Sequence, residues 1–146
     1  MRKLNVILVV VSLLLSGSVL ARDDRNRYSI EEAMNIAGAK EKLDRGYTYR
    51  FGDQSHGRIV TNHGNFMSNK KTNAFGKSDK EACQWAFLSA MLSFQDRITQ
   101  SGGNAVVNIQ SYYKKNEFSS TTEFECGNGA VIAGVTFTGD VVTLEN

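Results

Sequence analysis

The chain has 146 residues, of which 41% are hydrophobic and 22% are charged, with 13 glycines, no proline and 2 cysteines. This composition is typical of one globular domain and excludes a collagen-like, disulfide-dense or intrinsically disordered chain. The formal net charge of +2 is too small to indicate a general affinity for nucleic acid or for an anionic membrane.

Residues 1–21 have the layout of a secretory signal peptide. Arg2 and Lys3 give a basic start, Val6–Leu15 is an almost unbroken apolar run, and small residues follow it. We expect cleavage between Ala21 and Arg22, which leaves equal numbers of acidic and basic side chains in the mature chain. The apolar run is shorter than the roughly 20 residues that span a bilayer, and no cysteine for lipid attachment follows it. The sequence therefore predicts an exported protein, periplasmic or secreted, without membrane insertion.

A first amphipathic helix is expected over Ser29–Leu43, after a charged lead-in over Arg22–Arg27. Ser29 and Glu32 have the spacing of a capping box at the start of this helix, and Gly46 follows its end. The apolar positions between them recur at roughly helical spacing. We expect this helix to be peripheral in the domain.

Two short strands are expected next, over Tyr47–Phe51 and Arg58–Thr61. Both segments are rich in β-forming residues, and the turn formers of Gly52–Gly57 separate them. We therefore expect these two strands to pair with each other. The polar run Ser68–Asn73 is expected to be a loop because of its composition.

The strongest helical pattern covers Lys80–Thr99, with Ser78 as its cap and Glu81 three residues further on. Ser101–Gly103 is expected to end this helix. One apolar stripe along it indicates a face that packs on a core, and a second row widens the apolar arc. The stripe consists of Cys83, Phe87, Met91, Phe94 and Ile98, and the second row of Trp85, Leu88 and Leu92.

Three strands are expected in the last third of the chain, over Asn104–Tyr113, Phe118–Cys126 and Ala130–Leu144. The short link Gly127–Gly129 favours an antiparallel hairpin of the last two, and a bend is expected at Gly139 and Asp140. The element order α-β-β-α-β-β-β predicts an α+β fold. Residues 22–146 should form a single periplasmic domain, an antiparallel sheet of about five strands with one long helix packed on a face.

Cys83 and Cys126 are the two cysteines of the chain, and export to an oxidising compartment favours a disulfide between them. Cys83 starts the core-facing stripe of the long helix, and Cys126 ends a strand of the sheet on which that stripe must lie. A redox-active pair is the alternative, but the chain has no Cys-x-x-Cys motif. A metal site is less favoured, because both histidines are distant in sequence from the cysteines.

Catalytic chemistry has weak candidates. His56 or His63 could act as a general base with Asp53 or Asp79 nearby, which would make the protein a small hydrolase. The two histidines could also approach each other, but two imidazoles alone make a weak metal site. Gly76-Lys77-Ser78 fails as a phosphate-binding loop, since Lys71 stands where that motif requires glycine. We therefore expect no catalytic residue, no metal and no cofactor.

Paired lysines stand beside other polar or aromatic residues at two places in the sequence. Such groups can contact an envelope protein, or they can stack on and neutralise a polyanion. Zero net charge in the mature chain makes nucleic acid the weaker of these partners. The candidate partner surface consists of Lys70, Lys71, Tyr112, Tyr113, Lys114 and Lys115.

The sequence also resembles a family of small exported proteobacterial proteins that carry the label "excinuclease ATPase subunit". The likeness is most specific from Asn69 to Gly134, through Asn69–Ala74, Gly102–Ile109, Ser111–Glu117 and Glu125-Cys126. This resemblance supports the pairing of the two cysteines and implies no catalytic residue. An ATPase would need a phosphate-binding loop, which the chain lacks, so the label is not supported by these residues.

A more distant resemblance links Gly103–Val107 and the helix before it to the YbjQ-like proteins and the RcsF-type envelope stress sensors. It implies a compact α/β domain used for binding or assembly. The chain departs from the sensor family because the lipid-anchoring cysteine is absent. The function expected from the sequence is therefore a non-catalytic binding or assembly domain in the bacterial envelope, with a protein partner or as a homo-oligomer. The alternatives are a small periplasmic hydrolase and a polyanion-binding protein.

Overall fold

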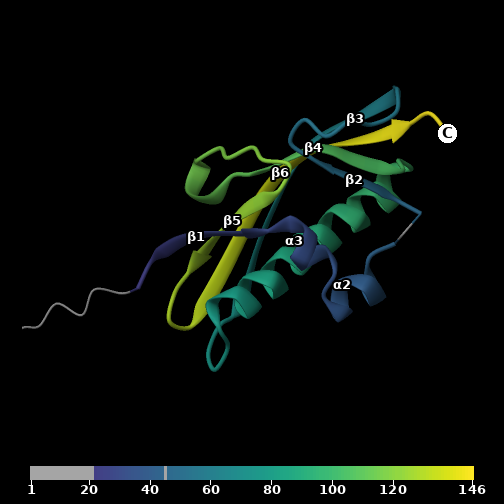
Figure 1. Cartoon of the computed structure of the whole chain (residues 1–146). Helices are drawn as coiled ribbons and strands as arrows, with labels where there is room; N and C mark the ends of the chain where they lie inside the picture. Colours follow the sequence, from purple (N-terminus) through teal and green to yellow (C-terminus); the bar gives the residue numbers. More distant parts are fainter. Residues whose placement is uncertain (1–21, 45) are drawn as a thin grey trace, which may run out of the picture.

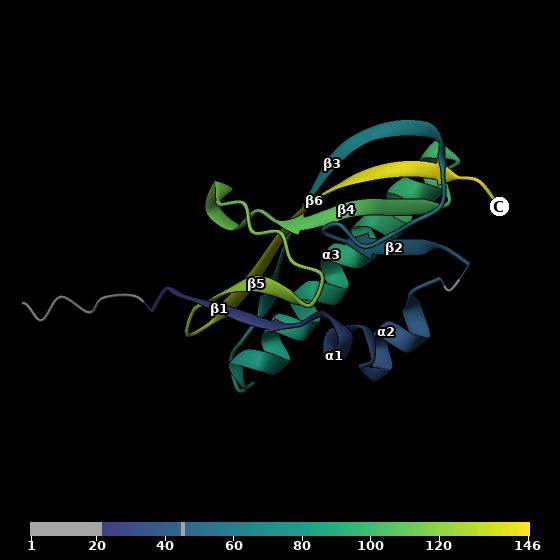
Figure 2. The ribbon, with the colours of Figure 1, turned by 45° about the horizontal axis from the view of Figure 1, so that its top comes forward.

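The computed structural model describes residues 22–44 and 46–146 (Figure 1). The expected signal peptide, with Ala21 at its cleavage site, lies outside the described residues. The described chain has a mixed α/β fold, in which a six-stranded sheet carries one long helix across a face (Figures 1 and 2). None of the helices in the described chain is long and apolar enough to cross a membrane.

Six strands, three α-helices and a short 3-10 helix make up the described chain. In chain order they are β1 (Asp24–Ser29), α1 (Ile30–Met34), α2 (Ala37–Lys42), β2 (Thr48–Phe51), β3 (Ile59–Asn73), α3 (Asp79–Ser101), β4 (Ala105–Ser111), η1 (Tyr113–Lys115), β5 (Glu123–Asn128) and β6 (Ile132–Leu144).

Strand β6 is the centre of the sheet. On one side it pairs with β3 along its whole length, from Ile132 opposite Asn73 to Leu144 opposite Ile59. On its other side it pairs first with β5 and then with β4, and β1 and β2 continue the sheet outward from these two. All pairs are antiparallel except β2 with β4, which run parallel. The prediction of an antiparallel sheet of about five strands is therefore correct only in part.

The expected hairpin between Tyr47–Phe51 and Arg58–Thr61 is wrong. Strand β2 pairs with β4, with Thr48 opposite Ala105, whereas Arg58–Thr61 leads into β3 beside β6. The expected loop over Ser68–Asn73 is also wrong, because this segment completes β3. Ser68 and Thr72 donate their hydroxyls to carbonyls of α3, so polar side chains are satisfied on the face of the strand that the helix covers.

The charged lead-in forms a strand that the sequence analysis missed. Strand β1 pairs with β5 at an edge of the sheet, where charged side chains are tolerated. Two of its arginines lie over aromatic rings, with Arg25 5.6 Å from the ring centre of Tyr113 and Arg27 3.7 Å from that of Phe118. Cation–π contacts of this kind place long basic side chains against the sheet rather than in solvent.

The expected helix over Ser29–Leu43 is divided into α1 and α2. Its cap is confirmed, since the Ser29 hydroxyl accepts a hydrogen bond from the Glu32 amide at 3.1 Å. The break follows Asn35, whose side chain donates to the Glu31 carbonyl at 2.8 Å and so competes with helical bonding. Both short helices bury residues against the core, including Ala33 and Ala39.

Helix α3 agrees closely with its prediction. The Ser78 hydroxyl caps it by accepting from the Glu81 amide, and Gly102 ends it in the left-handed conformation at φ 76°. All five residues of the predicted stripe are at most 1% exposed. In the second row Leu88 is buried, whereas Trp85 stays 39% exposed. The helix therefore anchors the core on the sheet.

The predicted bend at Gly139 and Asp140 does not interrupt β6. Gly139 instead allows close packing, because a Cβ there would lie 2.7 Å from Val106 Cγ1 and 3.3 Å from the ring of Phe94. The absence of a side chain lets α3, β4 and β6 meet at this point.

Candidate functional site

The disulfide between Cys83 and Cys126 is present and joins α3 to β5. Both cysteines are 0% exposed, and the Asn128 amide donates a hydrogen bond to the Cys83 sulfur at 3.0 Å. A bond enclosed in this way is a structural link, because no reductant or substrate can reach the sulfur atoms without opening the core. The predicted pairing is confirmed.

The predicted lysine and tyrosine surface is divided by the sheet. Ser68 and Thr72 contact α3, so alternation along β3 places Lys70 on the helix side and Lys71 on the opposite face. On that opposite face Lys71 meets Tyr113, since both flank the position where a Cβ of Gly134 would lie. The structure therefore brings Lys71 together with η1 but separates Lys70 from it.

Tyr113 has a packing role that the sequence analysis did not foresee. Its ring covers Gly127 and Gly134 in the hairpin of β5 and β6, and a Cβ on Gly127 would overlap its hydroxyl. Lys114 forms an ion pair with Asp23, and the hydrogen bond from Lys114 lowers the pKa of this carboxyl. Lys115 is exposed and Tyr112 is half-buried. Tyr113 and Lys114, by contrast, are engaged in contacts within the chain.

The residues considered for a hydrolase make contacts of other kinds. His56 Nδ1 lies 2.7 Å from the Gly57 carbonyl oxygen, and His63 Nε2 lies 2.8 Å from the Thr143 hydroxyl. The Asp79 carboxylate pairs with Arg22. In the part of the chain that the structure describes, no three His, Cys, Asp or Glu side chains gather as metal ligands.

Strand β3 is much longer than the strand predicted over Arg58–Thr61. It is 15 residues long and lies at an edge of the sheet, paired with β6 alone among the described strands (Figure 2). Its residues Val60 and Met67 are 55% and 61% exposed. A long edge strand with an unpaired row of amide and carbonyl groups is a template for another strand.

A groove runs beside this edge, between β3 and α3. It consists of two adjoining hollows of about 180 and 350 Å³, and both are lined by Ser93 and Asp96 of the helix. Phe66 and Arg97 border the first hollow, with the guanidinium 4.3 Å from the ring centre. Lys70 and Lys71 both border the second. The groove therefore offers mainly polar surface, with charges of both signs, next to the unpaired edge.

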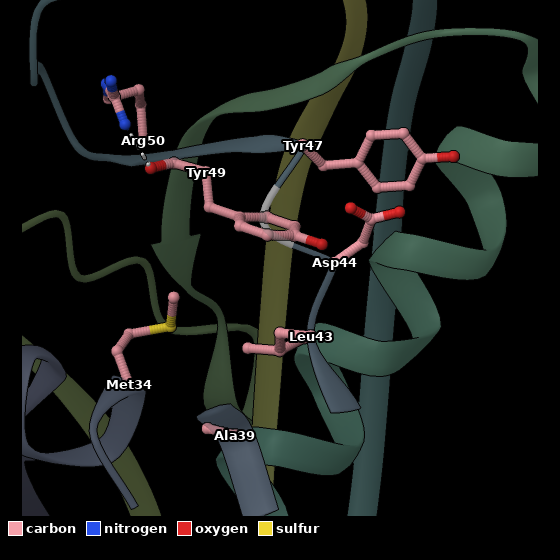
Figure 3. Close-up of a pocket in the computed structure, with 7 residues that line it drawn as sticks. All are labelled: Met34, Ala39, Leu43, Asp44, Tyr47, Tyr49 and Arg50. Carbon is pink, nitrogen blue, oxygen red and sulfur yellow. Dashed lines mark hydrogen bonds between the residues drawn. The ribbon is translucent and has the colours of Figure 1, made fainter. Parts of the chain in front are cut away.

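A separate pocket of about 240 Å³ lies between α2 and β2 (Figure 3). Tyr47 and Tyr49 are two residues apart in the sequence, so both side chains are on one face of the chain there, and Asp44 stands beside them (Figure 3). Leu43 and Ala39 are buried below the rings, and burial raises the pKa of the Tyr49 phenol.

Neither protein-family models nor curated proteins give a match to this chain. The resemblance drawn from the sequence therefore stays a hypothesis.

Proposed function

We propose that this protein is an exported, non-catalytic binding domain of the bacterial envelope that holds an extended segment of a partner protein along strand β3. The observation that carries this proposal is the unpaired edge of β3 beside the groove that it forms with α3. A segment added there would gain main-chain hydrogen bonds from the strand, and alternate side chains would enter the groove.

The regular part of the edge defines where such a segment would bind. The register of β3 with β6 shifts between Ile59 and Thr61 and between Asn62 and Gly64, and Gly64 has a φ of 114°. Bulges of this kind twist an edge away from further pairing. From Asn65 onward the register is regular, and charged side chains begin at Lys70. The window for pairing is therefore Asn65–Asn69.

The groove beside this window fits a protein segment better than a polyanion. Asp96 lies between the two hollows and opposes Lys70 and Arg97, so the groove carries mixed charge. A polyanion would favour a continuous basic surface, whereas the carboxylate of Asp96 lines both hollows among these basic residues. The hydrolase alternative has no support in the contacts of His56 and His63.

Site-specific photocrosslinking in the native envelope tests this proposal. A benzophenone amino acid at Met67, an exposed edge position, should yield one discrete adduct, and the same group at the exposed Thr121 should not. Met67→Lys adds a charge to the edge and should abolish the protection of the Asn65–Asn69 amides from hydrogen exchange that the complex produces. Thr121→Lys is the matched control.

The mass of the adduct identifies the occupant. An adduct of the chain with a different protein, together with slowed exchange over Asn65–Asn69, supports the proposal. An adduct of twice the mass of the chain shows that a second copy occupies the edge and overturns the assignment to a partner protein. Crosslinking at Met67 no stronger than at Thr121, with unchanged exchange at the edge, overturns strand addition altogether.

A further inference from the structure

We propose that the pocket between α2 and β2 binds a small organic ammonium group against Tyr49 and Tyr47, with Asp44 supplying the opposing charge. This site is distinct from the edge of β3 and does not depend on the function proposed for it. Its volume of about 240 Å³ suits a small molecule or one headgroup rather than a macromolecular segment.

The pocket combines an apolar floor with aromatic walls. Leu43 and Ala39 are 7% and 2% exposed and form the floor, and Met34 closes the side opposite Asp44 (Figure 3). Methyl groups of a quaternary ammonium are favoured by such a floor, while their positive charge is attracted to the face of a tyrosine ring. A floor of this kind with a carboxylate beside it selects a cation that also has apolar surface.

Helix α3 holds the walls in place before a ligand enters. The Tyr47 hydroxyl is 2.9 Å from the Thr99 hydroxyl, and the Tyr49 hydroxyl donates to Gln95 Oε1 at 3.3 Å. Gln95 Oε1 also accepts from the Asp44 amide, and Gln95 Nε2 donates to the Lys42 carbonyl at 3.2 Å. Gln95 thus fixes one ring and the Asp44 backbone together, which lowers the ordering cost of binding.

The charges at the pocket favour a cation. The Asp44 carboxylate accepts from the Gly46 amide at 2.7 Å and forms no ion pair with another described residue. Arg50 also lines the pocket, but its guanidinium donates to the Tyr49 and Ser55 carbonyls and extends away from Leu43 and Ala39 (Figure 3). The described lining therefore carries one charge of each sign, and the negative one lies beside the tyrosine rings (Figure 3).

Titration with choline, observed through the methyl signals of Met34 and Leu43, tests the site. Choline should shift these signals in a saturable manner, whereas its uncharged carbon isostere, 3,3-dimethylbutan-1-ol, should bind far more weakly. Asp44→Asn and Tyr49→Leu should each weaken choline binding by about two- to fivefold, the magnitude expected for one exposed ion pair or one cation–π contact. Tyr49→Phe keeps the ring but loses its hydrogen bond to Gln95, so it should weaken choline binding less than Tyr49→Leu does. Asp53→Asn is the matched control for charge.

Vesicles of phosphatidylcholine distinguish the source of the ammonium group. Cosedimentation that is lost in Asp44→Asn assigns a lipid headgroup, and choline binding without cosedimentation assigns a free ligand. Equal binding of choline and the neutral isostere, or no loss in either Asp44→Asn or Tyr49→Leu, overturns the proposal. These variants leave β3 unchanged, so failure here is independent of the crosslinking at Met67.

Discussion

Replacing Phe87 with alanine should remove one of the largest buried side chains that α3 contributes to the core. The side chain is 0% exposed, and its ring centre lies 4.7 Å from that of Phe124, 5.6 Å from Phe137 and 6.0 Å from Phe51. Truncation of a buried aromatic costs roughly 3–5 kcal/mol, and each aromatic pair contributes about 0.5–1.5 kcal/mol beyond burial. Since Phe87 touches three rings, we expect a loss near the upper end, about 4–5 kcal/mol of the free energy of unfolding.

Urea denaturation followed by far-ultraviolet circular dichroism measures this loss. Phe75→Ala is the matched control, because the same substitution at a side chain 76% exposed should change stability by less than about 0.5 kcal/mol. Phe87→Leu keeps most of the volume and should cost less than Phe87→Ala, which leaves a measurable variant if alanine unfolds the domain. A loss in Phe87→Ala within about 1 kcal/mol of the Phe75→Ala value would refute the assignment of α3 to the core.

Three further outcomes are expected. Cys83→Ser should lower the free energy of unfolding by up to about 4 kcal/mol, which is the loop-entropy estimate for two cysteines separated by 43 residues. Peptide mapping of the wild type without reductant should recover the linked pair of cysteines. Gly139→Ala should cost about 1–3 kcal/mol in urea denaturation because its Cβ would press on Val106, whereas Gly38→Ala, with no neighbouring atom closer than 3.1 Å, should cost less. Intact-mass measurement of the exported protein should give a chain that begins at Arg22, and a full-length product would contradict the predicted cleavage.

The parts of the fold that the sequence predicted are those in which burial produces a pattern. Helix α3 presents a row of buried side chains at helical spacing, and the strands β4, β5 and β6 are rich in β-forming residues that the core encloses. Strand β1 and most of β3 were missed because only one face of each strand or neither is buried. In β1 and in the second half of β3, charged and polar residues occupy the exposed positions, so no apolar alternation marks the strand.

Which strands pair with each other in the sheet is harder to predict than where the helices and strands lie in the sequence. The parallel pairing of β2 with β4 joins segments separated by the whole of β3 and α3, and local sequence carries no signal for it. The candidate sites could not be predicted from the sequence, because they too are formed by segments that are distant in the chain. The groove beside β3 and the pocket at Tyr49 exist only where α3 meets distant strands, whereas the disulfide could be predicted because two cysteines allow a single pairing.

The place of β6 in the chain order affects how the protein reaches its fold. Strand β6 is the shared partner of β3, β4 and β5, and it follows all three in the sequence. A chain that emerges from its amino end cannot complete this sheet until residues 132–144 have been made, because β6 alone among the described strands joins the β1–β5 pair, the β2–β4 pair and β3. Completion of the sheet is therefore a late step that depends on the last strand of the chain order.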